Sequence, residues 1–272
     1  MTEHDVLAPY SGSAIPHVGT YRRVLPVTLE RMYENALDWA HLPHIHASSF
    51  ASIECVDAGA WGWRANVTDA NGRGSVIELQ LDKTLRRWIT RNLEGSSQGS
   101  EIWTHAFAVD ARRVDINVDF FVPGVPAAAR EKVGQAYARA YTTLYDEDVA
   151  MMVERQRQID RRINTGGETV VDVGSEEALT AALAGTDPVE VHYRGRSFRL
   201  ATLGGKWFTY PAVCPHQLGP LGSSEMVEGI VRCPWHGYAF DVASGDCVNG
   251  HSCRLDNRPS VVVKAGRILL EP

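Results

Sequence analysis

The alternation of hydrophobic and polar residues predicts a helix, a run of strands and a second, long helix in the first half of the chain. After an irregular, proline-punctuated segment, apolar residues at helical spacing extend from about Leu29 to His41. Alternation at period two then predicts strands at Trp61–Val67, Val76–Leu81, Trp88–Arg91, Ile102–Val109 and Val114–Val122. From Pro126 to about Arg162 the pattern is that of one helix.

The second half is expected to consist of strands, with one short helix around Glu176–Ala184. Its strands are predicted at Thr169–Asp172, Val189–Tyr193, Ser197–Leu203, Lys206–Tyr210 and, as a pair, within Ser260–Leu270. A polar, glycine-rich break at Asn164–Gly167 separates the two halves. We therefore expect two domains, residues 1–165 and 168–272, and a chain of 272 residues is long enough to give each its own core.

Composition narrows the class of protein. The chain is 44% hydrophobic and 22% charged, as in ordinary globular proteins, and its net charge of −6 argues against a nucleic-acid partner. No stretch of 18 apolar residues occurs, and Met1–Pro16 lacks the pattern of a signal peptide, so we expect no membrane partner. Cys55, Cys247 and Cys253 form no obvious disulfide framework, which favours a reducing, cytoplasmic location.

Two short segments near the C-terminus carry metal-ligand residues. They are Cys214-Pro215-His216 and Cys233-Pro234-Trp235-His236-Gly237. Two loops that each offer one thiolate and one imidazole can hold a [2Fe–2S] cluster, with both cysteines on one iron and both histidines on the other. A structural zinc site accepts the same ligands. Two features argue against zinc. Neither segment leads into a finger-like helix, and the glycines suggest tight loops whose N–H groups face bridging sulfides.

This part of the chain resembles the Rieske family. Cys214-Pro-His-x-x-Gly-Pro-Leu221 and Cys233-Pro-Trp-His-Gly-Tyr-Ala-Phe240 are similar to its two cluster loops. The resemblance implies an all-β Rieske domain whose [2Fe–2S] cofactor is bound by Cys214, His216, Cys233 and His236. High-potential members have a cysteine pair where Gly219 and Trp235 stand, so the resemblance also implies a low-potential cluster.

A second possible metal site lies in the first half. Asp38 and His41 are three residues apart and would share one helix face, while Pro43 is expected to break the helix at Leu42. The chain could then turn back and bring His46 towards His41. Two histidines and one carboxylate with open positions form the facial triad of oxygen-activating, non-haem Fe(II) enzymes.

The segment resembles the Asp-x-x-His-x-x-x-x-His motif of Rieske-type oxygenases. The resemblance implies that His41 and His46 bind a mononuclear Fe(II), and that Asp38 links an iron ligand to a cluster ligand of a neighbouring subunit. The third ligand in that family is an aspartate on the last helix of the catalytic domain, and Asp148 fits best. Three alternatives stay open: Asp146 as the carboxylate ligand, His44 in place of His46, or Asp146–Asp148 as a solvated acidic face.

These patterns predict an α+β chain. A helix, an antiparallel sheet and a long C-terminal helix indicate a helix-grip (START-like) catalytic domain with an apolar cavity, followed by the all-β Rieske domain. The order is the reverse of that in most Rieske oxygenase α subunits. In addition, Gln217 stands where oxygenases often have arginine, which makes the second half look more like a Rieske ferredoxin.

The resemblance implies an oxidoreductase. Electrons from NAD(P)H would reach the cluster through an external ferredoxin or flavin reductase, and O₂ would be used to oxidise an apolar or aromatic small molecule. Monooxygenation is the first expectation, with dihydroxylation, demethylation and desaturation open. In that family the working cluster and iron span a subunit interface, so we expect a homotrimer. The alternatives are a non-catalytic Rieske electron carrier fused to a ligand-binding domain, and a zinc-stabilised binding module.

Overall fold

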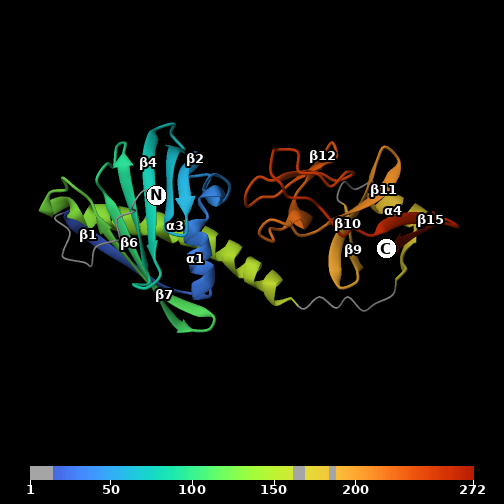
Figure 1. Ribbon diagram of the computed structural model, residues 1–272, viewed down its shortest axis with the longest axis horizontal. Coiled ribbons are helices and arrows are strands. Elements are labelled where there is room, and N and C mark those ends of the chain that lie inside the picture. Colours follow the sequence, from blue (N-terminus) through green and yellow to red (C-terminus); the bar gives the residue numbers. More distant parts are fainter. Residues whose placement is uncertain (1–14, 162–168, 184–187) are drawn as a thin grey trace. The chain divides into compact units, whose positions relative to one another are not determined.

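The computed structural model describes residues 15–161, 169–183 and 188–272, and these form two compact units, 1–156 and 157–272. The expected boundary at Asn164–Gly167 lies outside the described residues. Each unit is described by itself below. Together they have the α+β class expected from the sequence, because a mixed helix–sheet unit precedes a mainly β unit, and this prediction is confirmed (Figure 1).

The first unit is a seven-stranded sheet, entirely antiparallel, in the order β1-β7-β6-β5-β4-β3-β2. Figure 1 shows the long helix α3 (Arg130–Asp160), which follows a 3₁₀ turn at Ala127–Ala129, lying across this sheet. The arrangement is that of a helix-grip fold. The strands are β1 (His17–Leu25), β2 (Phe50–Gly59), β3 (Gly62–Asp69), β4 (Gly74–Asp82), β5 (Arg87–Glu94), β6 (Glu101–Asp110) and β7 (Arg113–Phe121).

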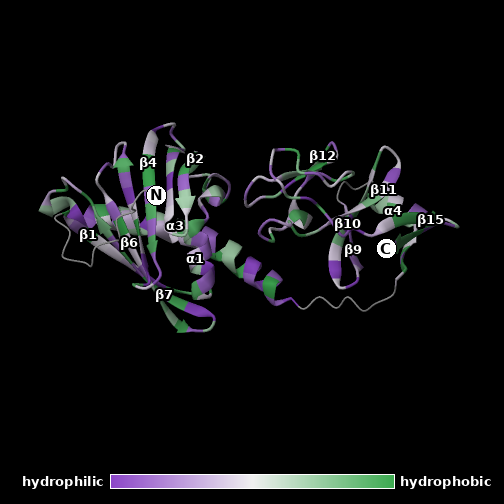
Figure 2. Cartoon of the chain, viewed as in Figure 1, coloured by the Kyte–Doolittle hydropathy of each residue, from purple (hydrophilic) through white to green (hydrophobic). Residues whose placement is uncertain are grey.

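The core of this unit lies between one face of the sheet and the helices. Every second residue of β7 is fully buried, namely Val114, Ile116, Val118 and Phe120. The Phe120 ring lies 5.1 Å from the ring centroids of both Tyr137 and Tyr141 of α3, so aromatic contacts join helix to sheet. In Figure 2 the visible turns of α3 alternate between hydrophobic and hydrophilic residues, as expected for a helix that buries one side.

The segment that precedes the sheet was expected to be irregular, but it forms the edge strand β1, which pairs with β7 from His17 to Leu25. The alternation of hydrophobic and polar residues in β1 is weak, because only Val18 and Leu25 are deeply buried. Gly19 and Gly134 bring β1 and α3 unusually close: a Cβ on Gly134 would lie 2.2 Å from the carbonyl oxygen of Val18. Both backbones therefore meet without intervening side chains.

Helix α1 (Leu29–Leu37) starts at Thr28, whose hydroxyl accepts a hydrogen bond from the Arg31 N–H. It ends before Asp38 (φ −89°, ψ 78°), and the chain continues through a 3₁₀ turn, Trp39–His41, into α2 (Leu42–Ile45). The expected break at Leu42 is wrong, since Leu42 is helical (φ −50°, ψ −49°). Pro43 stands in the first turn of α2, where its missing N–H costs no helical hydrogen bond.

The second unit consists of three small antiparallel sheets, with strand orders β11-β10-β9, β12-β13-β14 and β15-β16-β8, and the short helix α4 (Glu176–Leu183). Buried residues from α4, β9, β10 and β16 form one core. The two- and three-residue strands of the middle sheet were not predicted, because they are too short to show a period. The strands are β8 (Val171–Ser175), β9 (Val189–Tyr193), β10 (Arg196–Leu203), β11 (Lys206–Pro211), β12 (Met226–Val227), β13 (Ile230–Arg232), β14 (Ala239–Asp241), β15 (Ser260–Lys264) and β16 (Arg267–Glu271).

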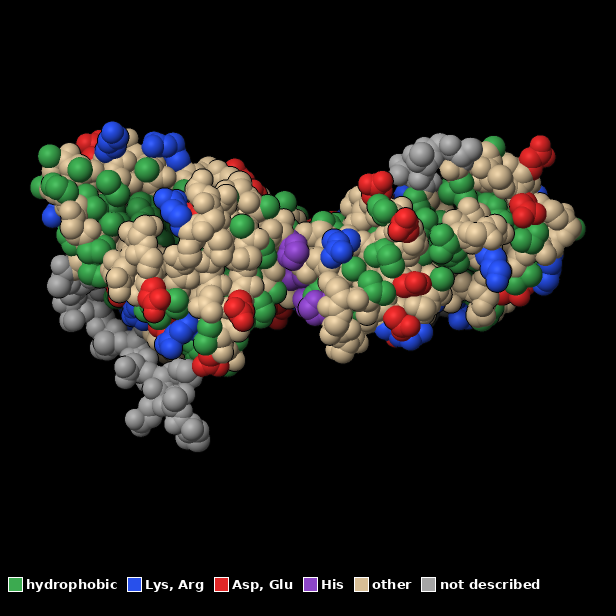
Figure 3. Space-filling model, turned by 90° about the horizontal axis from the view of Figure 1, so that it is seen from above, with side chains coloured by type: hydrophobic (Ala, Val, Ile, Leu, Met, Phe, Trp, Pro, Cys, Tyr) green, Lys and Arg blue, Asp and Glu red, His purple; other side chains and the backbone are tan. Residues whose placement is uncertain are grey.

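The surface carries charges of both signs. In the face shown in Figure 3, basic and acidic side chains are interspersed on both units. Among the residues that the structure describes, no helix combines the length and the apolar character needed to cross a membrane.

Candidate metal centres

The two cysteine–histidine loops of the second unit have the same backbone hydrogen bonds. In the first, the Cys214 N–H donates to the Gly219 carbonyl (2.8 Å) and the Leu218 N–H donates to the Cys214 carbonyl (3.1 Å). In the second, the N–H of Cys233 donates to the carbonyl five residues later (2.8 Å), and the N–H of Gly237 donates to the Cys233 carbonyl (3.0 Å). The residue four after each cysteine has positive φ, 64° at Leu218 and 67° at Gly237. The loops are therefore closed in the same way.

These loops bring four ligand side chains together. Cys214, Cys233 and His236 are buried, and the ring centroids of His216 and His236 are 4.6 Å apart. A hydrogen bond from the Cys214 thiol, and further ones from His236 and from the backbone N–H groups of residues 235 and 236, lower the pKa of Cys233 to about 5 against the effect of burial. Donors are thus directed at the Cys233 sulfur, and negative charge is favoured there.

The space around the sulfurs is tightly limited. A Cβ on Gly219 would lie 2.7 Å from the Cys233 sulfur and 3.1 Å from the Trp235 ring, so only glycine fits at this place in the first loop. Two thiols, two imidazoles and surrounding N–H donors form a donor set that fits a [2Fe–2S] cluster with mixed ligands.

Two side chains hold the cluster loops in place, Asn249 from outside them and Tyr238 from within the second loop. The Asn249 side chain accepts a hydrogen bond from the Ala239 N–H (3.1 Å) and donates one to the Gly237 carbonyl (3.0 Å). The Tyr238 ring stacks on the His216 ring, with centroids 4.3 Å apart and an interplanar angle of 12°. The role of Asn249 was not predicted, because this residue lies sixteen positions after Cys233 and outside the motif.

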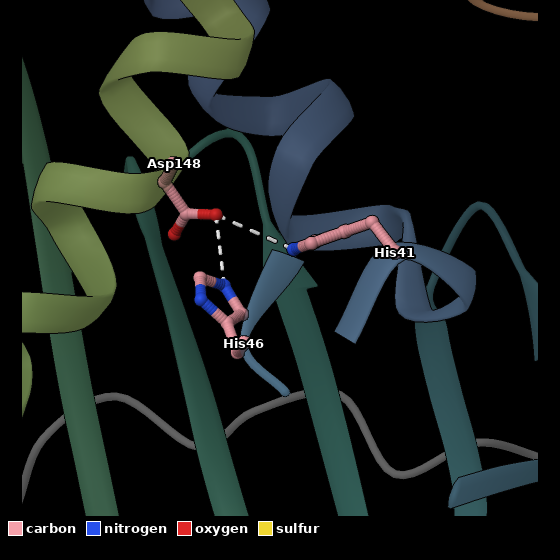
Figure 4. Close-up of side chains that lie close together, drawn as sticks. All are labelled: His41, His46 and Asp148. Atoms are coloured by element: carbon pink, nitrogen blue, oxygen red, sulfur yellow. Dashed lines mark hydrogen bonds and ion pairs between the residues drawn. The ribbon is translucent and has the colours of Figure 1, made fainter. Parts of the chain in front are cut away.

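The first unit brings His41, His46 and Asp148 to one point. One Asp148 carboxylate oxygen lies 3.3 Å from His41 Nε2 and 3.0 Å from His46 Nε2, and one ligand atom from each residue lies within 4.8 Å of the others. All three side chains are buried. Figure 4 shows both imidazoles pointing at the same oxygen of Asp148, which projects from α3. The donor set, two imidazole nitrogens and one carboxylate, fits a mononuclear Fe(II).

Further polar groups orient these three side chains. His46 Nδ1 lies 2.7 Å from a Glu147 carboxylate oxygen, and His41 Nδ1 lies 3.7 Å from Asp38. The Asn35 amide donates to Asp148 (3.0 Å). A carboxylate at the Nδ1 side of a histidine favours a proton there and leaves Nε2 as the metal-binding atom. Sequence reasoning missed Asn35 and placed Glu147 only in an acidic face, although Glu147 adjoins the proposed ligand.

The charges of this site depend on one another. Burial lowers the pKa of His41, but the nearby carboxylates of Asp148 and Asp38 outweigh it and raise the pKa to about 10. Burial raises the pKa of Asp148, and hydrogen bonds from His41 and His46 outweigh this, so its pKa falls below the ordinary range. Asp148 therefore carries a negative charge that a cation can share.

The alternatives left open by the sequence occupy other positions. The Asp146 side chain is 57% exposed and pairs with Arg23 (2.5 Å), away from the histidines. His44 is exposed, whereas His46 is buried beside Asp148. These positions favour His46 and Asp148 as the ligand choices.

A cavity of about 130 Å³ adjoins the three residues. Its walls include apolar side chains from β3, β4 and β5, and the polar Thr90, Thr104 and Tyr141. A dry cavity of about 150 Å³ holds a benzene molecule, so this one suits a ligand of a few heavy atoms. Burial raises the pKa of Tyr141 above the ordinary range, so its hydroxyl stays protonated and able to donate a hydrogen bond.

Comparison with known proteins supports the cluster site. Residues 170–259 match the family described as Rieske [2Fe-2S] domain, which covers about a third of the chain. The second unit therefore contains a Rieske domain, and its four ligand-type residues favour the iron–sulfur cluster over zinc. Apoptosis-inducing factor 3 of Mus musculus and of Homo sapiens are each 48% identical over 33 residues, which is 12% of this chain and 6% of those proteins. The chain thus spans only a small part of these curated relatives.

Solved structures resemble each unit separately. An aromatase/cyclase from a Streptomyces species (TM-score 0.44, 16% identity) covers 54% of this chain with 98% of its own. A START superfamily protein from Mycobacterium smegmatis (TM-score 0.42, 10% identity) covers 51% with 98% of its own. The ferredoxin of carbazole 1,9a-dioxygenase from Nocardioides aromaticivorans (TM-score 0.33, 21% identity) covers 39% with 99% of its own. At these scores no function is inferred from the similarity.

Proposed function

We propose that the chain is a Rieske-type non-haem iron oxygenase, in which the cluster domain supplies electrons to a mononuclear Fe(II) in the first unit. The observation that carries the proposal is the convergence of His41, His46 and Asp148, with ligand atoms within 4.8 Å of one another, beside a mainly apolar cavity. A Rieske domain in the same chain provides a one-electron donor of the kind that such a site needs.

In this proposal, iron bound by His41, His46 and Asp148 would supply the activation of O₂. The chain contributes orientation and exclusion of water. The Glu147 carboxylate lies 2.7 Å from Nδ1 of His46 and fixes the orientation of that ring. The Asn35 amide donates to the Asp148 oxygen that both histidines face. The mainly apolar cavity would hold a small apolar or aromatic substrate beside the ligand atoms, and the bound substrate would displace water from them.

The partners of the proposed enzyme follow from its chemistry. Electrons would come from an external ferredoxin or flavin reductase fed by NAD(P)H, and monooxygenation is the reaction that we propose first. We further propose a homotrimer, with Asp38 linking His41 to a cluster ligand of the neighbouring subunit. The contact between Asp38 and His41 Nδ1, at 3.7 Å, on the side of the ring away from the Nε2 atom that faces Asp148, supports this role.

The test is the iron content of anaerobically reconstituted protein, together with the spectrum of its reduced cluster. We expect about three iron atoms per chain, two of them in the cluster. Asp148→Ala should lower the value to about two and leave the cluster spectrum unchanged, because the cluster ligands lie in the other unit. Asp146→Ala is the matched control, two positions away on the same helix, and should keep about three.

A non-catalytic electron carrier fused to a ligand-binding domain is the second candidate. It is favoured by one observation: the Asp148 carboxylate already accepts a hydrogen bond from Asn35 and lies 3.0 Å from His46 Nε2, so its negative charge is compensated without a metal. Iron content separates the two functions. A wild-type value of about two, unchanged in Asp148→Ala, would establish the carrier and exclude the oxygenase.

A further inference from the structure

Cys247 and Cys253 adjoin an isolated backbone bridge in the second unit. Asp246 and Arg254 form an antiparallel bridge, and the Leu255 N–H donates to the Gly245 carbonyl (2.8 Å) beside it. In antiparallel register the next pair inward is Cys247 and Cys253. Opposed residues of such a pair have Cα atoms about 4.5–5.5 Å apart and side chains on the same face. Disulfides need Cα separations of about 4.4–6.8 Å, so the backbone spacing fits without rearrangement.

Cys253 is influenced by two other thiols, Cys247 and the cluster-loop residue Cys233. Burial raises the pKa of Cys253, and the neighbouring Cys247 raises it further. Both side chains are partly exposed, so an oxidant can reach them. The cysteine pair of high-potential Rieske proteins is absent here, because Gly219 and Trp235 occupy those positions. The Cys247–Cys253 pair stands at a different place, outside the two cluster loops.

The segment from one cysteine to the other, residues 247–253, contacts the second cluster loop through both backbone and side chains. Asn249 holds that loop through its bonds to the Ala239 N–H and the Gly237 carbonyl. The His251 ring stacks on Tyr238, with centroids 3.8 Å apart, and Tyr238 stacks in turn on His216. Any restraint on this segment therefore acts on the surroundings of the cluster.

We propose that Cys247 and Cys253 are a redox-active dithiol, and that their disulfide fastens segment 247–253 against the second cluster loop. Oxidation removes one hydrogen from each thiol, forms one S–S bond and reduces a disulfide oxidant such as oxidised glutathione to two thiols. The first thiolate forms a mixed disulfide, and the second displaces the glutathione thiolate from it. Because the backbone already holds the thiols opposite each other, the second step outcompetes further glutathione.

The anchoring of both ends explains why the dithiol is pre-organised. Arg254 pairs with Asp246 across the bridge and donates to the Ser244 carbonyl (2.9 Å). Cys247 itself forms an antiparallel bridge with Phe240, a fully buried residue of β14. The reduced pair is thus held from both sides. Closing the S–S bond would replace the hydrogen bond that the Cys247 thiol donates to the Asn249 side chain (3.1 Å).

The test uses the cluster-loaded full chain, incubated with oxidised and reduced glutathione at graded ratios, quenched with acid and alkylated. Cleavage before aspartate releases residues 246–255, in which Cys247 and Cys253 are the two cysteines. With excess oxidised glutathione, we expect this fragment to carry no alkyl group and to be lighter by two hydrogen atoms than the same fragment with two free thiols. Cys55 is the internal control: it faces Ala65 across β2 and β3, so it should acquire glutathione instead.

A second measurement tests the effect on the loop. The Ala239 amide hydrogen, bonded to Asn249, should exchange with solvent on the order of tenfold more slowly after oxidation, because the disulfide restrains opening of the segment. Cys253→Ser should abolish this difference, and Cys55→Ser should preserve it. Free thiols, or glutathione bound separately to Cys247 and Cys253 under excess oxidant, would overturn the proposal. So would equal exchange rates in the oxidised and reduced protein.

Discussion

Replacing Gly134 by alanine should destabilise the first unit, although alanine is the better helix former. Helix propensity alone predicts a gain of about 1 kcal/mol, since Gly134 lies inside α3. The added Cβ, however, would lie 2.2 Å from the Val18 carbonyl oxygen and 2.9 Å from its carbon. Both neighbours are backbone atoms of β1, so no side-chain rotation can relieve the contact.

The magnitude follows from the shift that the contact demands. A separation of 2.2 Å has to rise to at least 3.0 Å, so α3 and β1 must part by about 0.8 Å. A gap of this size forfeits about a quarter to a half of the dispersion energy between the surfaces, and overpacking of this kind costs about 1–3 kcal/mol. Because the atoms met are backbone and cannot rotate away, the cost lies in the upper part of this range, about 2–3 kcal/mol. After the gain of about 1 kcal/mol in propensity, we expect a net loss of about 1–2 kcal/mol, or roughly 2–8 °C in melting temperature.

The assay is calorimetry, which can resolve the unfolding of the two units, combined with iron content. Asp148 lies fourteen residues after Gly134 on the same helix, so a displaced α3 should also lower iron occupancy at the proposed site. Gly74→Ala is the matched control, because a Cβ there meets no atom within 4 Å. A Gly134→Ala protein as stable as the wild type, or more stable, would refute the close packing of α3 on β1.

Three further substitutions test the two sites, and a fourth tests the pH dependence of stability. Gly219→Ala should prevent assembly of the cluster, because its Cβ would lie 2.7 Å from the Cys233 sulfur, and a normal visible spectrum would contradict this. Glu147→Gln should weaken iron binding about 10–100-fold in equilibrium titrations, since it removes the carboxylate that orients His46. Asp38→Ala should leave both metals bound but slow the reduction of the mononuclear iron in stopped-flow experiments, and rapid reduction would exclude a linking role. Burial, and then the charge of Arg87, lower the pKa of His105 below 6.5, so its contribution to stability is present above pH 6.5 and is lost as the pH falls through the lower, folded-state value. Between pH 7.5 and 5, His105→Gln should therefore lose less thermal stability than the wild type.

The cluster site was predictable because its ligands are local in sequence. Cys214 and His216 lie two residues apart, Cys233 and His236 three, and the glycines beside them mark the tight turns. Short spacing fixes which side chains leave the same loop, whatever the rest of the fold does. The long helix and five of the seven strands of the first unit also followed from local periodicity, since one face of each is buried. The edge strand β1 did not, because a strand with few buried residues has little periodicity to detect.

Only tertiary structure selected among the remaining candidates. The sequence offered Asp146, Glu147 and Asp148 in a row, and the phase of α3 against the sheet turns Asp148 towards His41 and His46, and Asp146 towards Arg23. The direction in which one residue of a helix points depends on how the whole helix packs, and for α3 this packing includes the contact of Gly134 with β1.

Tertiary structure also decided the hydrogen-bond partners of the proposed metal ligands, which belong to no sequence motif. Asn35 meets Asp148, and Glu147 meets His46, because α1, α2 and α3 converge. Local spacing therefore determined which chemistry this chain carries. The long-range packing of strands and helices decided which atoms face one another, because contacts between segments distant in sequence leave no periodic trace in it.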